Sequence, residues 1–411
     1  MYQRQGAAAL KFNLDNITAL MQELGNPQHK VKTIHVAGTN GKGSSVHMLS
    51  SILQEAGYTT GLYTSPHLKS FTERIRINGR EISKQAVIEF VRRIRDAIEE
   101  IKPSFFEITF AMAMDYFVAA AVDIAIIEVG MGGRLDSTNI ISPEICLITN
   151  ISFDHQHLLG DTLEKIAAEK AGIIKENIPV VISQTQPEVA GVFQSRAVEL
   201  GAPLYFADKT YHLEQAAEKR FNVIANGQVV FEGILPDLKG EYQKFNFPGV
   251  LMTCALLEAN NWHIPEAAIV NGLQNVIHNT GLKGRWQQLS EKPLIIADTG
   301  HNEAGIAVII SELQQIAHTQ LHIVWGMVED KEVAHILELL PTAAIYYFVE
   351  PDIPRGLPAA DLGKLAGQYN LQGSVYDSVA AGIHAAKQRA NEEDCIFIGG
   401  STFVVAEIDE L

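Results

Sequence analysis

A lysine held between two glycines is the clearest chemical signal in this sequence. It lies in HVAGTNGKGSS, residues 35–45. Glycines let an anion approach the backbone N–H groups closely, and a lysine neutralises phosphate oxygens. The common phosphate loop reads G-x-x-x-x-G-K-[ST]; here Val36 replaces the first glycine and Gly43 stands at the hydroxyl position, with Ser44 following. The alternative interpretation is a glycine-rich turn with a solvated Lys42.

The residues on either side of this loop predict the elements that would present it. VKTIHVAG, residues 31–38, is rich in β-branched residues and ends in glycine, which is typical of a buried strand. In the segment that follows, Val46, Leu49, Ile52 and Ala56 are spaced to share one face of a helix. A strand, a glycine loop and a helix N-terminus in this order favour a polyphosphate site over a simple turn.

The same alternation of strands and helices predicts the architecture of the first domain. VDIAIIEVG (122–130) and EICLITNIS (144–152) are apolar runs of strand length, which favours a parallel, doubly wound α/β sheet of the P-loop NTPase-like kind. Between residues 202 and 238 the pattern changes to short alternating runs around Asn226-Gly227. That change predicts a small antiparallel insert with a hairpin turn.

A second α/β series predicts a second domain. Strand-length apolar runs separated by helical stretches occur at residues 293–300, 321–327, 344–351 and 394–400. They predict a Rossmann-like C-terminal domain. The expected division is residues 1–283 and residues 291–411.

Composition narrows the class of partner. The formal net charge of −16 argues against nucleic acid, because clustered Lys and Arg bind phosphate backbones. No run approaches the ~18 apolar residues of a membrane span, and the N-terminus lacks the apolar core of a signal peptide. Cys146, Cys254 and Cys395 lack metal-ligand spacing, which favours buried thiols. We expect a cytoplasmic monomer with no nucleic-acid or membrane partner.

Eight further motifs occur along the chain, one before the loop and seven after it. They are LGNP (24–27), GLYTSPHL (61–68), ERIRING (73–79), EVGMGGRLDSTN (128–139), DHQHLLGDTLEKIAAEKAGIIK (154–175), GRWQ (284–287), DTGHN (298–302) and PRG (354–356). Together with AGTNGKGS, this order resembles the Mur ligase superfamily, in particular its folylpolyglutamate synthase/dihydrofolate synthase branch. The glycine before the loop hydroxyl is the form found in that branch.

The resemblance implies an ATP-dependent amide ligase of folate metabolism. Such enzymes use ATP and Mg²⁺ to convert a folate carboxylate into an acyl phosphate, and the amino group of L-glutamate then displaces phosphate. The implied N-terminal domain (1–283) binds ATP, and the implied C-terminal domain (291–411) is the glutamate-ligase domain. Both domains contribute to the ATP site. Glutamylation of tetrahydrofolate, together with conversion of dihydropteroate to dihydrofolate, is expected of one enzyme.

The resemblance also implies the residues of the nucleotide site. Lys42 is expected to be catalytic at the γ-phosphoryl group, and Arg suits a phosphate because its fork donates two hydrogen bonds. His301 is implied as catalytic near the incoming glutamate, although a helix N-cap Asp298 with an incidental histidine is the alternative. Thr299 departs from the small apolar residue of the family pattern. The implied ATP-binding residues are Thr39, Asn40, Gly41, Lys42, Gly43, Ser44, Asn246, Arg285 and Asp298.

Glu128 is the strongest candidate for a metal ligand. It ends a predicted apolar strand, where an unpartnered carboxylate is costly, and Mg²⁺ prefers oxygen ligands. Ligands of open α/β sheets collect at such strand ends. The resemblance adds Ser65 and His155 as magnesium ligands; taken singly, these would be a turn hydroxyl and a surface or capping histidine.

Lys170 receives opposite interpretations. In DTLEKIAAEKAG, Asp161 is a plausible N-cap with Glu164 three residues on, so Lys170 falls near the helix C-terminus, where a solvated lysine stabilises the dipole. The resemblance implies instead a catalytic lysine carbamylated by CO₂. That reaction needs a partly deprotonated amine, which burial promotes.

The resemblance implies a folate pocket from Phe106, Asp136 and Ser137, although a core phenylalanine is an equal interpretation of Phe106. Residues 7–14, AAALKFNL, replace the segment that contacts dihydropteroate in bifunctional members. The choice between dihydropteroate and tetrahydrofolate therefore stays open. Two rival functions are a P-loop kinase and a nucleotide-gated binding module.

Overall fold

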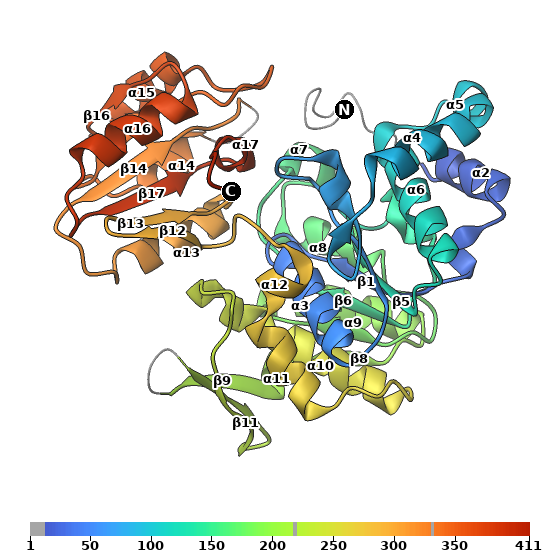
Figure 1. Cartoon of the computed structure of the whole chain (residues 1–411). Coiled ribbons are helices and arrows are strands. Elements are labelled where there is room, and N and C mark those ends of the chain that lie inside the picture. Colours follow the sequence, from blue (N-terminus) through green and yellow to red (C-terminus); the bar gives the residue numbers. More distant parts are fainter. Residues whose placement is uncertain (1–12, 217–219, 330–332) are drawn as a thin grey trace. The chain divides into compact units, whose positions relative to one another are not determined.

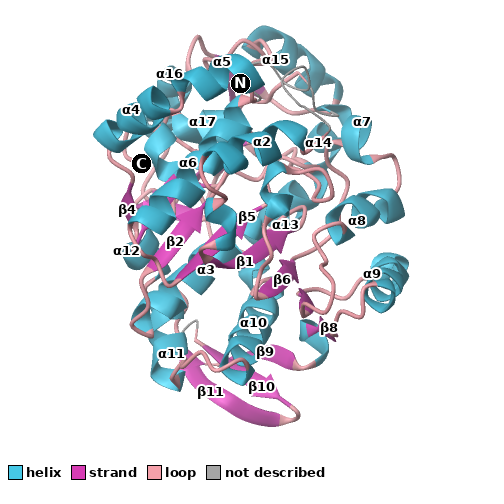
Figure 2. Cartoon of the chain, turned by 90° about the vertical axis from the view of Figure 1, so that its right-hand side faces the viewer, coloured by secondary structure: helices cyan, strands magenta, loops and turns pink. Residues whose placement is uncertain are grey.

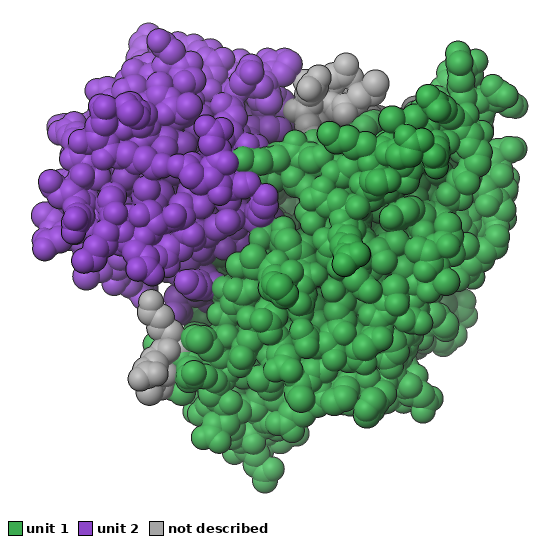
Figure 3. Space-filling model, viewed as in Figure 1, with its two compact units in different colours: residues 1–238, 242–282 green, residues 239–241, 283–411 purple. Residues whose placement is uncertain are grey.

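The chain folds into two compact units in a computed structural model, which describes residues 13–216, 220–329 and 333–411. The first unit comprises Met1–Leu238 and Tyr242–Leu282, and the second comprises Lys239–Glu241 and Lys283–Leu411 (Figure 3). Each unit has its own sheet, so each is described separately.

The first unit is built on an eight-stranded sheet in the order β4-β3-β2-β5-β1-β6-β7-β8 (Figure 1). From β2 to β8 the neighbouring strands pair in parallel, whereas the β2–β3 and β3–β4 pairs at one edge are antiparallel. The central strands lie side by side in Figure 2. The strands are β1 Lys32–Ala37, β2 Thr60–Tyr63, β3 Ile75–Ile77, β4 Arg80–Glu81, β5 Ile124–Glu128, β6 Ile145–Ile148, β7 Val180–Ile182 and β8 Leu204–Phe206.

Helices cover both faces of this sheet, as in a doubly wound fold. Alternate residues of β1 and β5 enter different cores: Ile34 and Ile126 pack with α3, α10 and α11, whereas Ile127 packs with α6. The helices of this unit are α2 Asp15–Glu23, α3 Lys42–Glu55, α4 Lys84–Arg93, α5 Arg95–Ile101, α6 Phe105–Ala119, α7 Gln156–Leu159, α8 Leu163–Ala171, α9 Pro187–Glu199, α10 Phe247–Ala259, α11 Glu266–Gln274 and α12 Val276–Thr280.

The helix after the phosphate loop is buried more completely than its sequence predicts. Val46, Leu49 and Ile52 are fully buried as expected, but every residue from 44 to 53 is buried. The reason is that α3 contacts β1, β2 and β5 as well as α10, α11 and α12. The helix that carries the loop is therefore held on several sides.

The antiparallel insert is present but begins later than the sequence predicts. Its strands are β9 Tyr211–Gln215, β10 Phe221–Ala225 and β11 Gln228–Ile234, in the order β11-β10-β9. The predicted turn joins β10 to β11, and both Asn226 (φ 51°) and Gly227 (φ 76°) adopt the left-handed backbone that a two-residue hairpin favours. β8, which lies within the expected insert, instead pairs in parallel with β7 as the last strand of the large sheet.

The second unit has a six-stranded sheet in the order β12-β13-β17-β14-β15-β16. All its pairs are parallel except β12 with β13. The predicted α/β fold class of both units is confirmed. The elements are β12 Gln287–Glu291, β13 Leu294–Ala297, α13 Glu303–Leu313, β14 Leu321–Trp325, α14 Val333–Leu339, β15 Ile345–Phe348, α15 Ala359–Gln368, β16 Gly373–Val375, α16 Val379–Arg389, β17 Cys395–Gly399 and α17 Thr402–Ala406.

Within the described ranges, no helix combines the length and the apolar character that a membrane span requires.

Candidate active site

The glycine loop joins the carboxyl end of β1 to the N-terminus of α3, as its sequence predicts. Gly41 caps the helix in a left-handed conformation (φ 86°), and Lys42 is the first helical residue. The Lys42 ammonium turns back onto its own loop, where Nζ donates to the carbonyls of Gly38 (3.0 Å) and Thr39 (3.2 Å). The lysine is therefore held at the mouth of a helix N-terminus, where an anion is favoured.

The segment after β6 fixes the loop. The N–H groups of Thr39 and Asn40 donate to the carbonyl and side-chain oxygens of Asn150 (2.9 Å each), and the Ser152 N–H donates to Thr39 Oγ1 (3.0 Å). A Cβ on Gly38 would lie 1.7 Å from Thr149 Oγ1. Sequence reasoning missed these partners, although polar residues directly after an apolar strand beside β1 were the available signal.

Asn246 lies against the phosphate loop although it is far from it in sequence. It precedes α10, and a Cβ on Gly41 would lie 2.1 Å from its Oδ1 atom. Asn246 Nδ2 donates to Gln243 Oε1 (2.8 Å), and Gln243 Nε2 donates to Ser44 Oγ (3.1 Å). The structure thus brings a predicted nucleotide residue from position 246 to the phosphate loop.

Lys170 is buried, so its interpretation as a solvated helix-end cation is wrong. Its exposed fraction is 4%, and its Nζ donates to the Gly38 carbonyl (2.9 Å), the same oxygen that Lys42 contacts. Burial, followed by the Lys42 charge, lowers the pKa of Lys170 to about 7, against the opposing effect of Asp154 and Asp136. A large neutral fraction at physiological pH follows.

The start of α8 differs from the prediction. Thr162, not Asp161, is the N-cap, and its hydroxyl accepts from the Lys165 N–H (3.3 Å). Asp161 instead pairs with the Lys165 ammonium at 2.7 Å, and no capping box with Glu164 forms. The one-residue shift arises because Thr162 takes the extended backbone that an N-cap needs.

Glu128 and Ser65 are neighbours at the carboxyl ends of β5 and β2. Glu128 is the last residue of β5, is 5% exposed, and its Oε2 accepts from the Ser65 backbone N–H (3.0 Å). His155 follows β6 and contacts Asp154, with 3.8 Å between its Nε2 and Oδ1 of the carboxylate.

These three residues fit a magnesium ion by their donor chemistry. A buried carboxylate, a hydroxyl and an imidazole supply oxygen and nitrogen donors, and Mg²⁺ usually keeps several waters. Within the described residues, His, Cys, Asp and Glu side chains alone form no group of three that could hold a metal.

Two of the candidate folate residues meet at Gly130. A Cβ on Gly130 would lie 2.5 Å from Cζ of Phe106 and 3.0 Å from Oδ2 of Asp136, so both side chains lie against one glycine. Phe106 is half-buried and packs edge-on against Tyr63, with ring centroids 6.0 Å apart. Ser137 follows Asp136 directly at the start of the 3₁₀ turn η4, Ser137–Ile140.

Sequence reasoning missed a cation near this pocket. Arg74 is buried, its Nε donates to His67 Nδ1 (2.8 Å), and its guanidinium lies 5.4 Å from the centre of the Phe105 ring. Burial and the Arg74 charge lower the pKa of His67 to about 4. The burial of Arg74 could not be read from the sequence, because its partner His67 belongs to a different motif, and arginine is almost never buried without partners.

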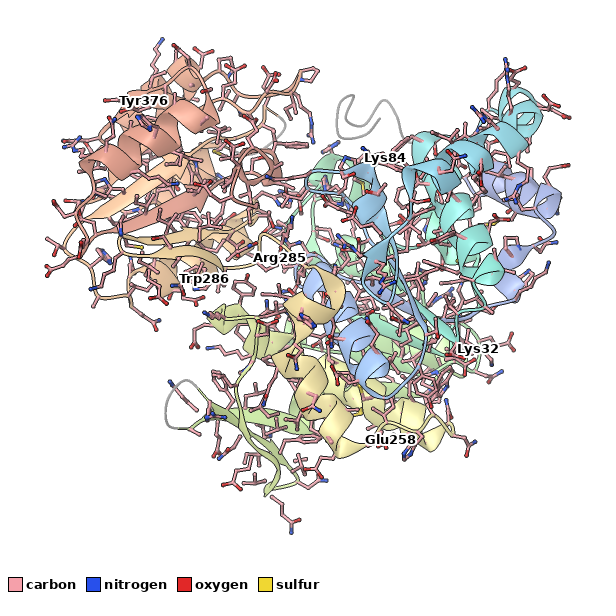
Figure 4. The ribbon with its side chains drawn as sticks, in the orientation of Figure 1. Lys32, Lys84, Glu258, Arg285, Trp286 and Tyr376 are labelled. Carbon is pink, nitrogen blue, oxygen red and sulfur yellow. The ribbon has the colours of Figure 1, made fainter. Side chains whose placement is uncertain are left out.

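In the second unit, Asp298 organises the turn that holds Arg285. The Asp298 carboxylate accepts from the backbone N–H groups of Trp286 and Gly300 (2.7 Å each). Arg285 and Trp286 are labelled in Figure 4. The Arg285 guanidinium contacts the Thr299 hydroxyl, which donates to Gly284 (3.1 Å). Thr299 thus has a role that the sequence pattern did not predict.

His301 and Asn302 follow on the same loop. His301 Nδ1 lies 3.0 Å from the Thr299 carbonyl, and Asn302 is the N-cap of α13, with Oδ1 accepting from the Gly305 N–H (2.9 Å). The interpretation of Asp298 as this N-cap is therefore wrong. Asp298 and His301 both follow β13, at the strand end where α/β sites form.

Known proteins share both the motifs and the fold. Residues 36–199 match the Mur ligase middle domain, and residues 284–402 match the Mur ligase glutamate ligase domain. The dihydrofolate synthase/folylpolyglutamate synthase of Bacillus subtilis (strain 168) is 34% identical over 412 residues, covering 97% of this chain and 94% of the relative. The chain belongs to the folylpolyglutamate synthase/dihydrofolate synthase family. The resemblance inferred from the sequence is confirmed.

Solved structures of this family superpose on the chain. E. coli FolC in complex with DHPP and ADP has a TM-score of 0.87 at 31% identity, covering 97% of this chain and 93% of that one. A bifunctional folylpolyglutamate synthase/dihydrofolate synthase with Mn, AMPPNP and L-glutamate bound has a TM-score of 0.85 at 30% identity, with coverage of 97% and 93%. The first of these family members binds DHPP and ADP, and the second binds Mn, AMPPNP and L-glutamate.

Proposed function

We propose that this chain is an ATP- and Mg²⁺-dependent ligase that joins L-glutamate to a folate carboxylate through an acyl phosphate. The γ-phosphoryl group passes to the carboxylate, ADP leaves, and the glutamate amine attacks the carbonyl carbon. The amide forms, phosphate leaves, and the amine loses its proton.

The observation that supports this proposal best is the convergence of Lys42 and Lys170 on the Gly38 carbonyl. Two lysines beside a helix N-terminus repel each other unless an anion lies between them or one is neutral. A phosphate group satisfies Lys42 and the N–H groups at the N-terminus of α3. A carbamate on Lys170 removes the second positive charge.

Each remaining candidate has a stated role in the proposal. Thr39, Asn40, Gly41, Gly43 and Ser44 cradle the phosphates with Lys42. Asn246, Arg285 and Asp298 contact ATP, and His301 orients the incoming glutamate. Ser65, Glu128 and His155 would hold Mg²⁺, whose charge offsets that of the phosphates when it is bound.

The acceptor pocket is proposed to include Phe106, Asp136 and Ser137. We propose both tetrahydrofolate and dihydropteroate as acceptors, since relatives named dihydrofolate synthase/folylpolyglutamate synthase match the chain along most of its length. Of residues 7–14, which were expected to bear on dihydropteroate, residues 7–12 lie outside the described residues. Residues 1–283 are assigned to ATP binding and residues 291–411 to glutamate ligation.

We further propose a cytoplasmic monomer without nucleic-acid or membrane partners. The cysteines Cys146, Cys254 and Cys395 are free and buried, which suits a reducing compartment. The charge of −16 disfavours nucleic acid.

The test supplies ATP, Mg²⁺, labelled L-glutamate and either tetrahydrofolate or dihydropteroate. Formation of a labelled amide with stoichiometric ADP is expected. A phosphorylated product that keeps its phosphate and incorporates no glutamate would indicate a kinase and overturn the proposal. Slow ATP hydrolysis as the sole activity would indicate a nucleotide-gated module.

A further inference from the structure

A chain of buried polar groups lies behind the candidate folate pocket. His35 on β1 approaches the Thr138 hydroxyl (Nε2 to Oγ1, 2.9 Å), and that hydroxyl donates to Oδ1 of Asp136. His35 and Thr138 are fully buried, and Asp136 is 8% exposed. None of the roles assigned above uses His35 or Thr138.

Burial raises the pKa of Asp136, whereas hydrogen bonds from Thr138, Met131 and Gly130 lower it; the direction of this chain is that of the ionised carboxylate, which these donors stabilise. A carboxylate only accepts hydrogen bonds, so the Thr138 hydroxyl donates its single proton to Asp136. Thr138 Oγ1 can then only accept from His35, which requires the proton of the imidazole to be on Nε2. Nδ1 is left as a bare acceptor, and it has no hydrogen-bond partner among the described residues.

The surroundings of His35 agree with a neutral ring. Burial, followed by the Lys175 charge, lowers the pKa of His35 to about 3. The Lys175 ammonium is itself engaged, because it donates to the Asn139 carbonyl (2.7 Å). A neutral imidazole has one donor and one acceptor nitrogen, so His35 acts as a single donor toward Thr138.

The Asp136 carboxylate is aimed by donors on both of its oxygens. Oδ1 accepts from the Thr138 N–H (3.0 Å) as well as from its hydroxyl, and Oδ2 accepts from the Met131 N–H (2.9 Å). Oδ2 is the atom that lies against Gly130, where the Phe106 ring also packs. Fixing Oδ1 therefore fixes which way Oδ2 faces.

We propose that His35 and Thr138 are positioning residues for the acceptor site: they hold the Asp136 carboxylate so that Oδ2 accepts from the N–H groups of a pteridine ring stacked on Phe106. This proposal rests on the proposed function for the substrate class. It assigns no contact between His35 or Thr138 and the substrate.

Thr138→Val tests the chain because it removes the hydroxyl and keeps the side-chain shape. Losing this charge-assisted hydrogen bond to the Asp136 carboxylate should raise the KM for the pteridine acceptor about tenfold or more. kcat at saturating acceptor and the KM values for ATP and glutamate should stay nearly unchanged. Thr138→Ser, which retains the hydroxyl, should behave as wild type.

Thr33→Val is the matched control. Thr33 lies on β1 two residues before His35, is 1% exposed, and its Oγ1 has no hydrogen-bond partner in the part of the chain that the structure describes. The same chemical change at an equally buried site should leave the acceptor KM at the wild-type value. An equal increase of the acceptor KM in Thr33→Val and Thr138→Val would show a general packing effect and overturn the proposal. So would an equal rise of the KM values for acceptor, ATP and glutamate in Thr138→Val.

A second measurement needs no substrate. Long-range ¹H–¹⁵N NMR spectra of protein labelled at histidine report which ring nitrogen of His35 has the proton. Nε2–H is expected, whereas Nδ1–H would overturn the proposal even if Thr138→Val failed to fold. Absence of glutamylation by the wild type would refute the proposed function instead; an active wild type with an unchanged Thr138→Val variant would refute the positioning role alone.

Discussion

Replacing Lys170 with methionine tests most sharply whether this buried lysine is a carbamylated catalytic residue. Methionine is unbranched and flexible, so it fills the space of the lysine stem without a charge. If Lys170 is a carbamylated catalytic residue, Lys170→Met should abolish most ligase turnover while the protein stays folded. A lysine buried without a catalytic role would leave the rate unchanged.

The fraction of Lys170 that can react with CO₂ follows from its pKa. An ordinary lysine has a pKa of 10.5, whereas burial and the Lys42 charge lower that of Lys170 to about 7. At neutral pH about half of the Lys170 amines are therefore neutral, roughly a thousandfold more than at an exposed lysine. Only the neutral amine reacts with CO₂, so carbamate formation should increase as the pH rises through 7.

The lowered pKa of Lys170 also makes the stability of the folded protein rise with pH. Because the folded pKa of Lys170 lies below its unfolded value, the unfolded chain binds more protons between pH 7 and 10.5. The destabilisation from burying the ammonium is complete below pH 7 and is relieved as the pH rises. The unfolding free energy of the CO₂-free wild type should therefore increase relative to that of Lys170→Met across this window, as measured by urea denaturation.

The assay follows glutamate incorporation by enzyme stripped of CO₂ and then supplied with bicarbonate. Wild type should lose activity and recover it, and acetate should partly restore Lys170→Ala by occupying the vacated space. Lys165→Ala is the control on the same helix, because Lys165 forms an exposed pair with Asp161 and should not affect turnover. Full activity of Lys170→Met without CO₂ would refute the carbamate.

Three further substitutions test other parts of the site. Lys42→Ala should remove most turnover with little change in melting temperature, because its ammonium donates to two carbonyls of its own loop; near-normal activity would contradict the phosphate-loop role. Arg285→Ala should raise the KM for ATP about tenfold or more by removing a charge-assisted contact, and an unchanged KM in steady-state kinetics would remove Arg285 from the nucleotide site. Gly38→Ala should lower both stability and ATP binding, since its Cβ would overlap Thr149; a melting temperature equal to that of wild type would contradict the packing of the loop.

Much of the fold could be predicted because its signals are local. The strand before the loop, the later apolar strands and the Asn226-Gly227 turn each depend on residues close in sequence. Where the prediction was wrong, either a pairing partner distant in sequence or a one-residue shift of a helix start decided the structure. β8 pairs with β7 in the large sheet, and Thr162 replaced Asp161 as the N-cap.

The sequence by itself determined the phosphate loop, the parallel α/β order and the family. Glycine spacing, strand periodicity and motif order depend only on which residues occur and how far apart they lie in the sequence. Only the tertiary structure decided that Lys170 is buried against Gly38, that Asn246 lies at Gly41, and that His35 reaches Asp136 through Thr138. Burial and charge set a pKa or a hydrogen-bond direction through neighbours in space, and those neighbours come from strands and helices far apart in sequence.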